Sequence, residues 1–117
     1  MMGCKMKIDI DFDYPVLPYE RLCEIRECDL NQSYSALSEV DQLNLFFMLL
    51  TTLCECEKAG RRAESEHLCY LISYYLFVLL TPPGSAEIAL YYAEKAAVLS
   101  GDEERYKNWI EYVKKGN

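Results

Sequence analysis

The longest apolar run in the chain extends from Leu68 to Leu80 and contains one clearly polar side chain, Ser73. A membrane-spanning helix needs about 20 consecutive apolar residues, so a run of this length is typical of a buried helix in a globular core. Charged residues precede the run and two prolines follow it, and proline lacks the backbone donor that a helix requires. The pattern predicts a central helix from about Arg61 to Thr81.

Three other segments have apolar residues at helical spacing: Ser38 to Lys58, Ser85 to Ser100 and Asp102 to Lys115. A glycine follows each of them at the position of a left-handed C-terminal cap. A shorter helix is expected from Pro18 to about Cys28. The polar stretch from Asp29 to Leu37 is expected to be a loop.

The helix from Ser38 to Lys58 carries an unusually wide apolar arc. One face consists of Val40, Leu43, Phe47, Leu50 and Cys54. A second group extends that face: Leu45, Phe46, Leu49 and Leu53. The apolar arc is therefore wider than a single neighbouring helix needs.

The segment from Met6 to Asp13 alternates apolar and charged residues, which predicts an extended strand with Ile8 and Ile10 on its apolar face. No other segment has a β-pattern, so the backbone groups of this strand need a partner from elsewhere. The strand either lies across the helices or pairs with the same segment of a second chain. We favour the homodimer, with docking onto another protein's sheet as the alternative.

These elements together predict an all-α fold. At 117 residues the chain is long enough for one core and too short for two. We expect a compact bundle of four to five helices, made of helical hairpins, over residues 18–117. An extended segment over residues 1–17 precedes it.

Negative charge is concentrated in the first half of the chain. Residues 1–60 contain eleven acidic and five basic residues, a net charge of −6, whereas residues 61–117 have a net charge of −1. Such a surface repels phosphate backbones, which argues against direct nucleic-acid binding. The acidic surface would suit contact with a basic protein surface. The alternative is that the negative charge only maintains solubility.

The six cysteines lie within helical patterns and most resemble small core residues. The segment from Met1 to Asp13 lacks the apolar stretch of a signal peptide. We therefore expect a cytoplasmic protein with free thiols and without a membrane partner.

The spacing of four acidic residues near the N-terminus resembles a calcium-binding loop, but a residue that such a loop requires is missing. Asp9, Asp11, Asp13 and Glu20 fall at positions 1, 3, 5 and 12 of an EF-hand loop. Tyr14 occupies position 6, where the sharp turn of that loop requires glycine. No calcium site is expected.

Zinc and nucleophilic chemistry are also disfavoured. Cys54 and Cys56 with His67 and Cys69 form the ligand set of a structural zinc site. Residues two apart on a helix, however, point to nearly opposite sides. The same divergence separates His67 from Cys69 as a base and nucleophile. We expect no catalytic, cofactor-binding or metal-binding residues.

The segment from Ala89 to Leu99 resembles the second helix of a tetratricopeptide repeat, with alanines at the small positions of that family. The resemblance covers about residues 71–101. Phe77 departs from it, since the family has a small residue at that position, and no second repeat is visible about 34 residues earlier. The resemblance implies a helical hairpin that binds peptides or protein surfaces.

Surface recognition is the function class that remains. Tyr70, Ser73, Tyr74 and Phe77 form a strip along the central helix, and tyrosine is enriched where proteins meet. The alternative is that this strip packs under the N-terminal segment.

We therefore expect a small acidic protein–protein interaction module without catalytic activity. The second hypothesis is an inhibitor or immunity protein, of the kind that phages and mobile elements encode, whose acidic N-terminal half occupies a basic groove of a target enzyme. The candidate contact residues are Tyr70, Tyr74, Phe77, Asp9, Asp11, Asp13, Ile8 and Ile10.

Overall fold

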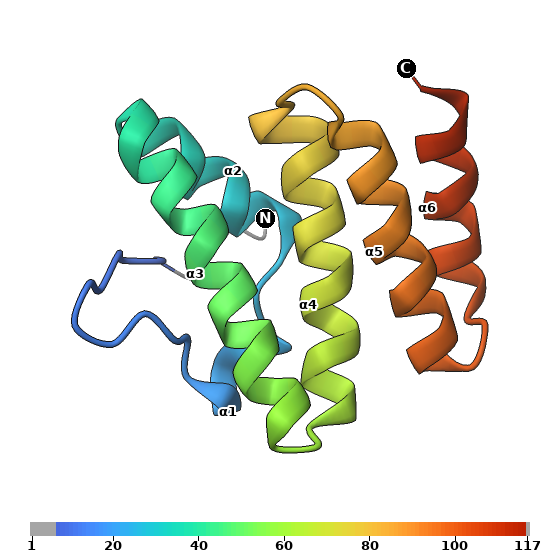
Figure 1. The fold of residues 1–117 in the computed structure, drawn as a ribbon, viewed down its shortest axis with the longest axis horizontal. Coiled ribbons are helices and arrows are strands. Elements are labelled where there is room, and N and C mark those ends of the chain that lie inside the picture. Colours follow the sequence, from blue (N-terminus) through green and yellow to red (C-terminus); the bar gives the residue numbers. More distant parts are fainter. Residues whose placement is uncertain (1–6, 117) are drawn as a thin grey trace, which may run out of the picture.

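The computed structural model describes residues 7–116, and every regular element in that part of the chain is a helix (Figure 1). The elements are α1 (Tyr19–Leu22), α2 (Glu27–Ala36), α3 (Glu39–Lys58), α4 (Arg62–Tyr74), the π-helix η1 (Tyr75–Leu80), α5 (Ser85–Ser100) and α6 (Glu104–Lys115). The predicted all-α bundle is confirmed. It has six α-helices in the described residues, where four to five were expected.

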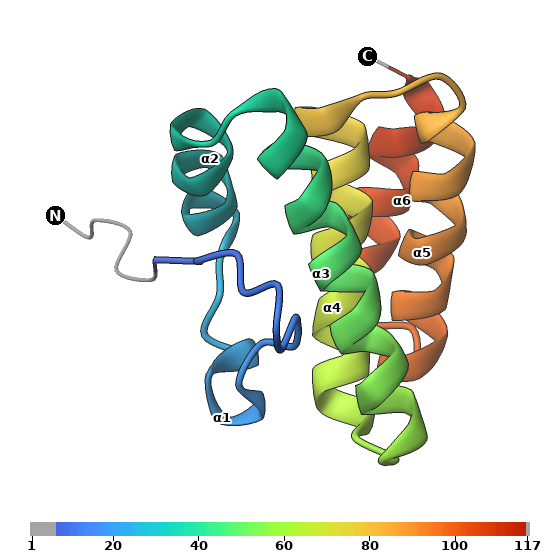
Figure 2. The same cartoon turned by 60° about the vertical axis from the view of Figure 1, so that its left-hand side comes forward.

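Helices α3, α4, α5 and α6 follow one another as antiparallel neighbours across the molecule (Figure 1). α1, α2 and the segment of residues 7–18 lie on the α3 side of this array (Figure 2). α4 is central because it packs against α3 on one side and α5 on the other. None of the helices in residues 7–116 combines the length and the apolar character that crossing a bilayer requires.

The predicted central helix is confirmed as α4 followed without a break by η1. Its largest fully buried side chains are Leu68, Leu71, Ile72, Tyr75 and Leu76. The helix ends at Thr81, whose φ of 46° is left-handed, directly before the two prolines. The chain has to reverse there because proline cannot continue the helical hydrogen bonds.

The glycine that follows α3 ends that helix as its position predicts. Gly60 has a φ of +71°, and the N–H of Arg61 donates to the carbonyl of Cys56 at 2.9 Å. A glycine is suited to this left-handed conformation because it has no Cβ. The short turn that results makes α3 and α4 an antiparallel hairpin.

The prediction of a loop from Asp29 to Leu37 is wrong, because most of these residues belong to α2. Asp29 is only 2% exposed, and its carboxylate accepts the backbone N–H of Arg26 at 2.8 Å, which caps the first turn. Leu30 is completely buried and anchors the helix to the core. The helix expected from Pro18 to Cys28 is correspondingly reduced to the four residues of α1.

The expected strand from Met6 to Asp13 is not present in its described part, residues 7–13. The alternation predicts one apolar face, yet Ile8 is 5% exposed and Phe12 is 73% exposed. The reason is a turn at Asp11, whose Oδ1 accepts two backbone N–H groups farther along the chain, each at 3.0 Å. The first residue of the expected strand lies outside the described part of the chain.

Candidate functional site

Helix α3 has two apolar faces, and the rest of the described chain covers only one of them. The covered face consists of Leu45, Met48, Leu49, Leu53 and Cys56. On the opposite side Val40 is 70% exposed, Leu43 is 47% exposed and Phe47 is 55% exposed. We call the set Val40, Leu43, Phe47, Leu50 and Cys54 the α3 outer face; Leu50 is half-buried and Cys54 is exposed.

The α3 outer face has the spacing of a helix-pairing surface. Its five residues are separated by three, four, three and four positions. This is the heptad spacing of the a and d positions at which one helix interlocks with another. An apolar residue exposed singly has no such regularity and needs no explanation.

Carboxylates border the α3 outer face on both sides. At 100° per residue, Glu39 and Glu57 fall along one border and Glu55 is the carboxylate nearest the other, whereas Asp41 falls toward the buried side of the helix. Glu55 and Glu57 each form an ion pair with a lysine, at 3.6 and 2.7 Å. No ion pair holds Glu39 within the described residues. The most exposed end of the face is therefore bordered by uncompensated negative charge.

The tyrosine strip of α4 and η1 packs against α6 and α2, and within residues 7–116 its ring and hydrogen-bond partners come from these helices. The ring of Trp109 lies 5.5 Å from the ring of Tyr70, 6.0 Å from that of Tyr74 and 6.0 Å from that of Phe77, measured between centroids. The hydroxyl of Tyr74 also donates to Oδ1 of Asn31 in α2 at 2.8 Å. These three sequence candidates are thus joined in one aromatic cluster that holds helices together.

Ser73, the polar residue in the central apolar run, is completely buried and joins three helices. Its hydroxyl donates to the carbonyl of Ala89 in α5 at 2.6 Å. The same oxygen accepts the indole N–H of Trp109 in α6 at 2.7 Å. This arrangement explains why a hydroxyl is tolerated at the centre, since both of its hydrogen-bonding roles are satisfied.

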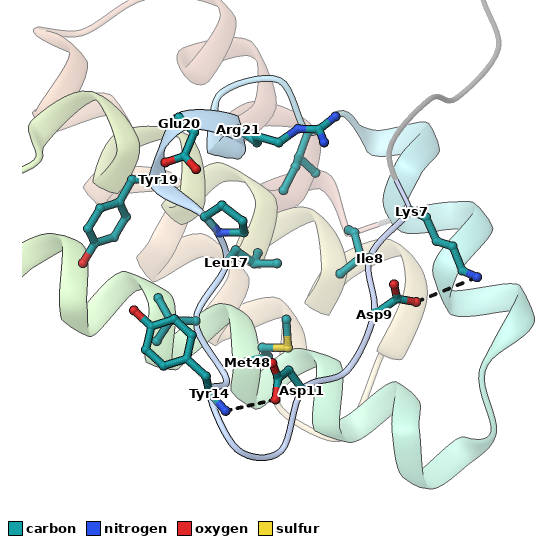
Figure 3. Close-up of a pocket in the computed structure, with 13 residues that line it drawn as sticks. Lys7, Ile8, Asp9, Asp11, Tyr14, Leu17, Tyr19, Glu20, Arg21 and Met48 are labelled. Atoms are coloured by element: carbon teal, nitrogen blue, oxygen red, sulfur yellow. Dashed lines mark hydrogen bonds and ion pairs between the residues drawn. The ribbon is translucent and has the colours of Figure 1, made fainter.

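A pocket of about 570 Å³ lies between the N-terminal segment and the helices behind it (Figure 3). Ile8, Leu17 and Met48 line its interior, while Asp9 and Asp11 lie at its edge. The segment is anchored beside it by a hydrogen bond from the N–H of Leu17 to the hydroxyl of Thr52 at 3.0 Å. The other N-terminal candidates are placed differently: Ile10 is half-buried and Asp13 is exposed.

The histidine and the thiols are placed for packing. Nε2 of His67 lies 2.7 Å from the carbonyl oxygen of Ile25, and burial lowers the pKa of this histidine. Burial raises the pKa of Cys69 to about 12, so its thiol stays protonated at neutral pH. The thiolate is the reactive form of a cysteine. His67 and Cys69 are therefore unsuited to act as base and nucleophile.

The cysteines of the described chain differ in whether their sulfur is free or bonded. Cys23, Cys54, Cys56 and Cys69 are free thiols. Cys28 is disulfide-bonded, in contrast to the expectation that the thiols are free. Within residues 7–116, histidine, cysteine and acidic side chains do not gather in groups of three or more that would hold a metal ion.

Comparison with known proteins returned no matching family model, no matching curated protein and no matching solved structure. The resemblance to a tetratricopeptide repeat therefore stays a prediction.

The candidate contact residues predicted from the sequence do not include three residues that surround the tyrosine strip: Glu27, Trp109 and Tyr112. Glu27 accepts the hydroxyl of Tyr70 at 2.5 Å, and the ring of Tyr112 lies 5.4 Å from that of Trp109. The apolar positions of the segment from Asp102 to Lys115 include Trp109, but their spacing does not indicate which helix they contact. Such a contact depends on how α6 crosses α4, which residue spacing alone does not fix.

Proposed function

We propose that this protein is a small acidic protein–protein interaction module that acts by binding an α-helix of a partner along the α3 outer face. The observation that carries the proposal is the heptad spacing of an exposed apolar face on a 20-residue helix whose other face is already buried. A soluble chain rarely leaves so regular an apolar surface exposed unless something binds there.

The partner that fits this surface is an amphipathic helix with basic borders. An apolar stripe on the partner would interlock with the five residues of the face, and a lysine or arginine beside the stripe would meet Glu39. The net charge of −7 would further favour a basic partner by long-range attraction. Binding of a helix in this way needs no catalytic group.

The test uses three synthetic helical peptides with the same leucine and isoleucine stripe. The first has lysine and arginine at its other positions, the second has glutamate there, and the third is a scrambled form of the first. We expect the basic peptide to bind and the acidic and scrambled peptides to bind at least tenfold more weakly by calorimetry, about 1.4 kcal/mol.

Two protein variants locate the site. Phe47→Ser removes the central residue of the α3 outer face, and Val98→Ser is the matched control, because Val98 is 69% exposed on a different helix. We expect Phe47→Ser to weaken binding of the basic peptide at least tenfold. The proposal is wrong if Val98→Ser weakens binding equally, or if Phe47→Ser leaves it unchanged.

The inhibitor hypothesis is the second candidate, and the exposure of Asp9, Asp11 and Asp13 favours it. Three exposed carboxylates along one irregular segment would suit a basic groove on a target enzyme. Replacing all three by lysine would then abolish inhibition of the target and would leave binding of the helical peptide nearly unchanged. Loss of peptide binding in this variant would instead place the peptide on the N-terminal segment.

Two other expectations belong to this proposal. A homodimer through the N-terminal segment stays a prediction, since part of that segment lies outside the described residues. A cytoplasmic location also stays a prediction.

A further inference from the structure

A second pocket, of about 340 Å³, opens beside the aromatic cluster where α2, α4 and α6 meet. Four aromatic rings line it: Tyr70, Tyr106, Trp109 and Tyr112. Its remaining lining residues are Glu27, Arg105 and Asn108. The pocket is separate from the α3 outer face and from the pocket under the N-terminal segment.

The rings that line the pocket are inclined to one another by different angles. The plane of Tyr70 is inclined by 75° to that of Trp109 and by 50° to that of Tyr106. Trp109 and Tyr112 are closer to parallel, at 26°. Each ring face carries partial negative charge, so a pocket lined by four aromatic rings suits a cation held over one of these faces.

The charges around the pocket add to this attraction. Glu27, Glu66 and Glu103 are the nearby carboxylates, and Arg105 is the nearby cation. Glu66 and Glu103 lie 3.6 and 3.5 Å from the guanidinium of Arg105, so its charge is compensated. The charge of Glu27 is left to face the pocket. The pocket wall already holds one cation on a ring, since the Arg105 guanidinium lies 4.5 Å from the centroid of Tyr106.

The lining of the pocket is richer in aromatic rings than in hydrogen-bond acceptors. Glu27 accepts the hydroxyl of Tyr70 and keeps further acceptor positions, and Asn108 supplies one amide oxygen, whereas the hydroxyl of Tyr106 is engaged with Glu66. An ammonium group would bring three N–H donors that need acceptors, and leaving them unsatisfied is costly. A trimethylammonium group has no N–H donor and spreads its charge over methyl groups that pack against rings.

We infer that this pocket binds a trimethylammonium group. The group could belong to a choline-type small molecule or to a trimethylated lysine side chain, because both present the same cation to the rings. This inference does not depend on the function proposed for the α3 outer face.

The experiment compares choline with 3,3-dimethylbutan-1-ol, which has the same shape but carries carbon in place of the charged nitrogen. Both are titrated into the full chain by calorimetry, with the fluorescence of Trp109, the single tryptophan, as a second readout. We expect saturable binding of choline, and binding of the neutral alcohol that is roughly 5- to 30-fold weaker. A parallel titration with trimethyl-lysine shows which source binds more tightly.

Three variants locate the binding. Tyr112→Leu removes a lining ring that is 44% exposed, and Glu27→Gln removes the carboxylate charge while leaving an acceptor for Tyr70. Tyr91→Leu is the control, since Tyr91 is 58% exposed and lies outside the pocket. We expect the first two to weaken choline binding at least fivefold and the control to change it less than twofold, with all variants folded by circular dichroism.

Three results would overturn the inference. One is the absence of saturable binding of either trimethylammonium compound. Another is equal or tighter binding of the neutral alcohol, which would make the pocket a site for apolar groups. The last is an equal loss of choline binding in Tyr91→Leu and in the two pocket variants.

Discussion

Replacing Ser73 by alanine tests whether the buried hydroxyl joins three helices. The substitution removes the acceptor of the Trp109 indole N–H and the donor to the Ala89 carbonyl. A buried polar group left without a partner costs about 1–3 kcal/mol. Water can reach part of Trp109, which is only half-buried, so we expect a loss of about 1–2 kcal/mol in the free energy of unfolding.

Chemical denaturation followed by circular dichroism measures this loss, and the emission of Trp109 reports on the same site. Ser35→Ala is the matched control, because Ser35 is an exposed serine of α2. Its effect should stay within about 0.5 kcal/mol, as at most surface positions. A loss below about 0.5 kcal/mol for Ser73→Ala, with unchanged emission, would refute the three-helix junction.

Three further predictions follow from burial and charge. Leu76→Ala should lower the free energy of unfolding by about 2–5 kcal/mol, since Leu76 is 2% exposed at the centre of the bundle. A loss below about 0.5 kcal/mol in chemical denaturation would contradict this prediction. Iodoacetamide should modify the exposed Cys54 in the folded protein and spare the buried Cys69 until denaturant is added, as mass spectrometry of the peptides would show. The proposed homodimer through the N-terminal segment predicts that deleting residues 1–13 lowers the mass measured by light scattering from that of a dimer to that of a monomer, and a monomeric full-length protein would exclude this dimer.

The helix ends and the central helix could be predicted because local chemistry determines them. Glycine after α3 and two prolines after η1 restrict the backbone in any surroundings. α2 could not be predicted in this way. Its residues have weak helical preference, and the burial of Leu30 and the cap by Asp29 depend on the core that forms beside them.

The candidate site was predictable only in part. The sequence indicates that the apolar arc of α3 is too wide for one neighbour, but it does not indicate which half stays exposed. That choice is made by packing: Met48 and Leu49 face the bundle, and the five residues of the α3 outer face do not. The aromatic pocket likewise needs Glu27 from α2 beside Tyr112 from α6, and these residues are distant in sequence.

The most direct test of the proposed function is to map the binding surface by NMR. The basic amphipathic peptide is added to isotopically labelled protein, and changes in the backbone amide shifts are recorded for each residue. We predict that the largest changes fall within residues 40–54 of α3 and that they are absent in Phe47→Ser. Changes concentrated on α6 or on residues 7–18, with α3 unaffected, would contradict the assignment of the α3 outer face as the site that binds a partner helix.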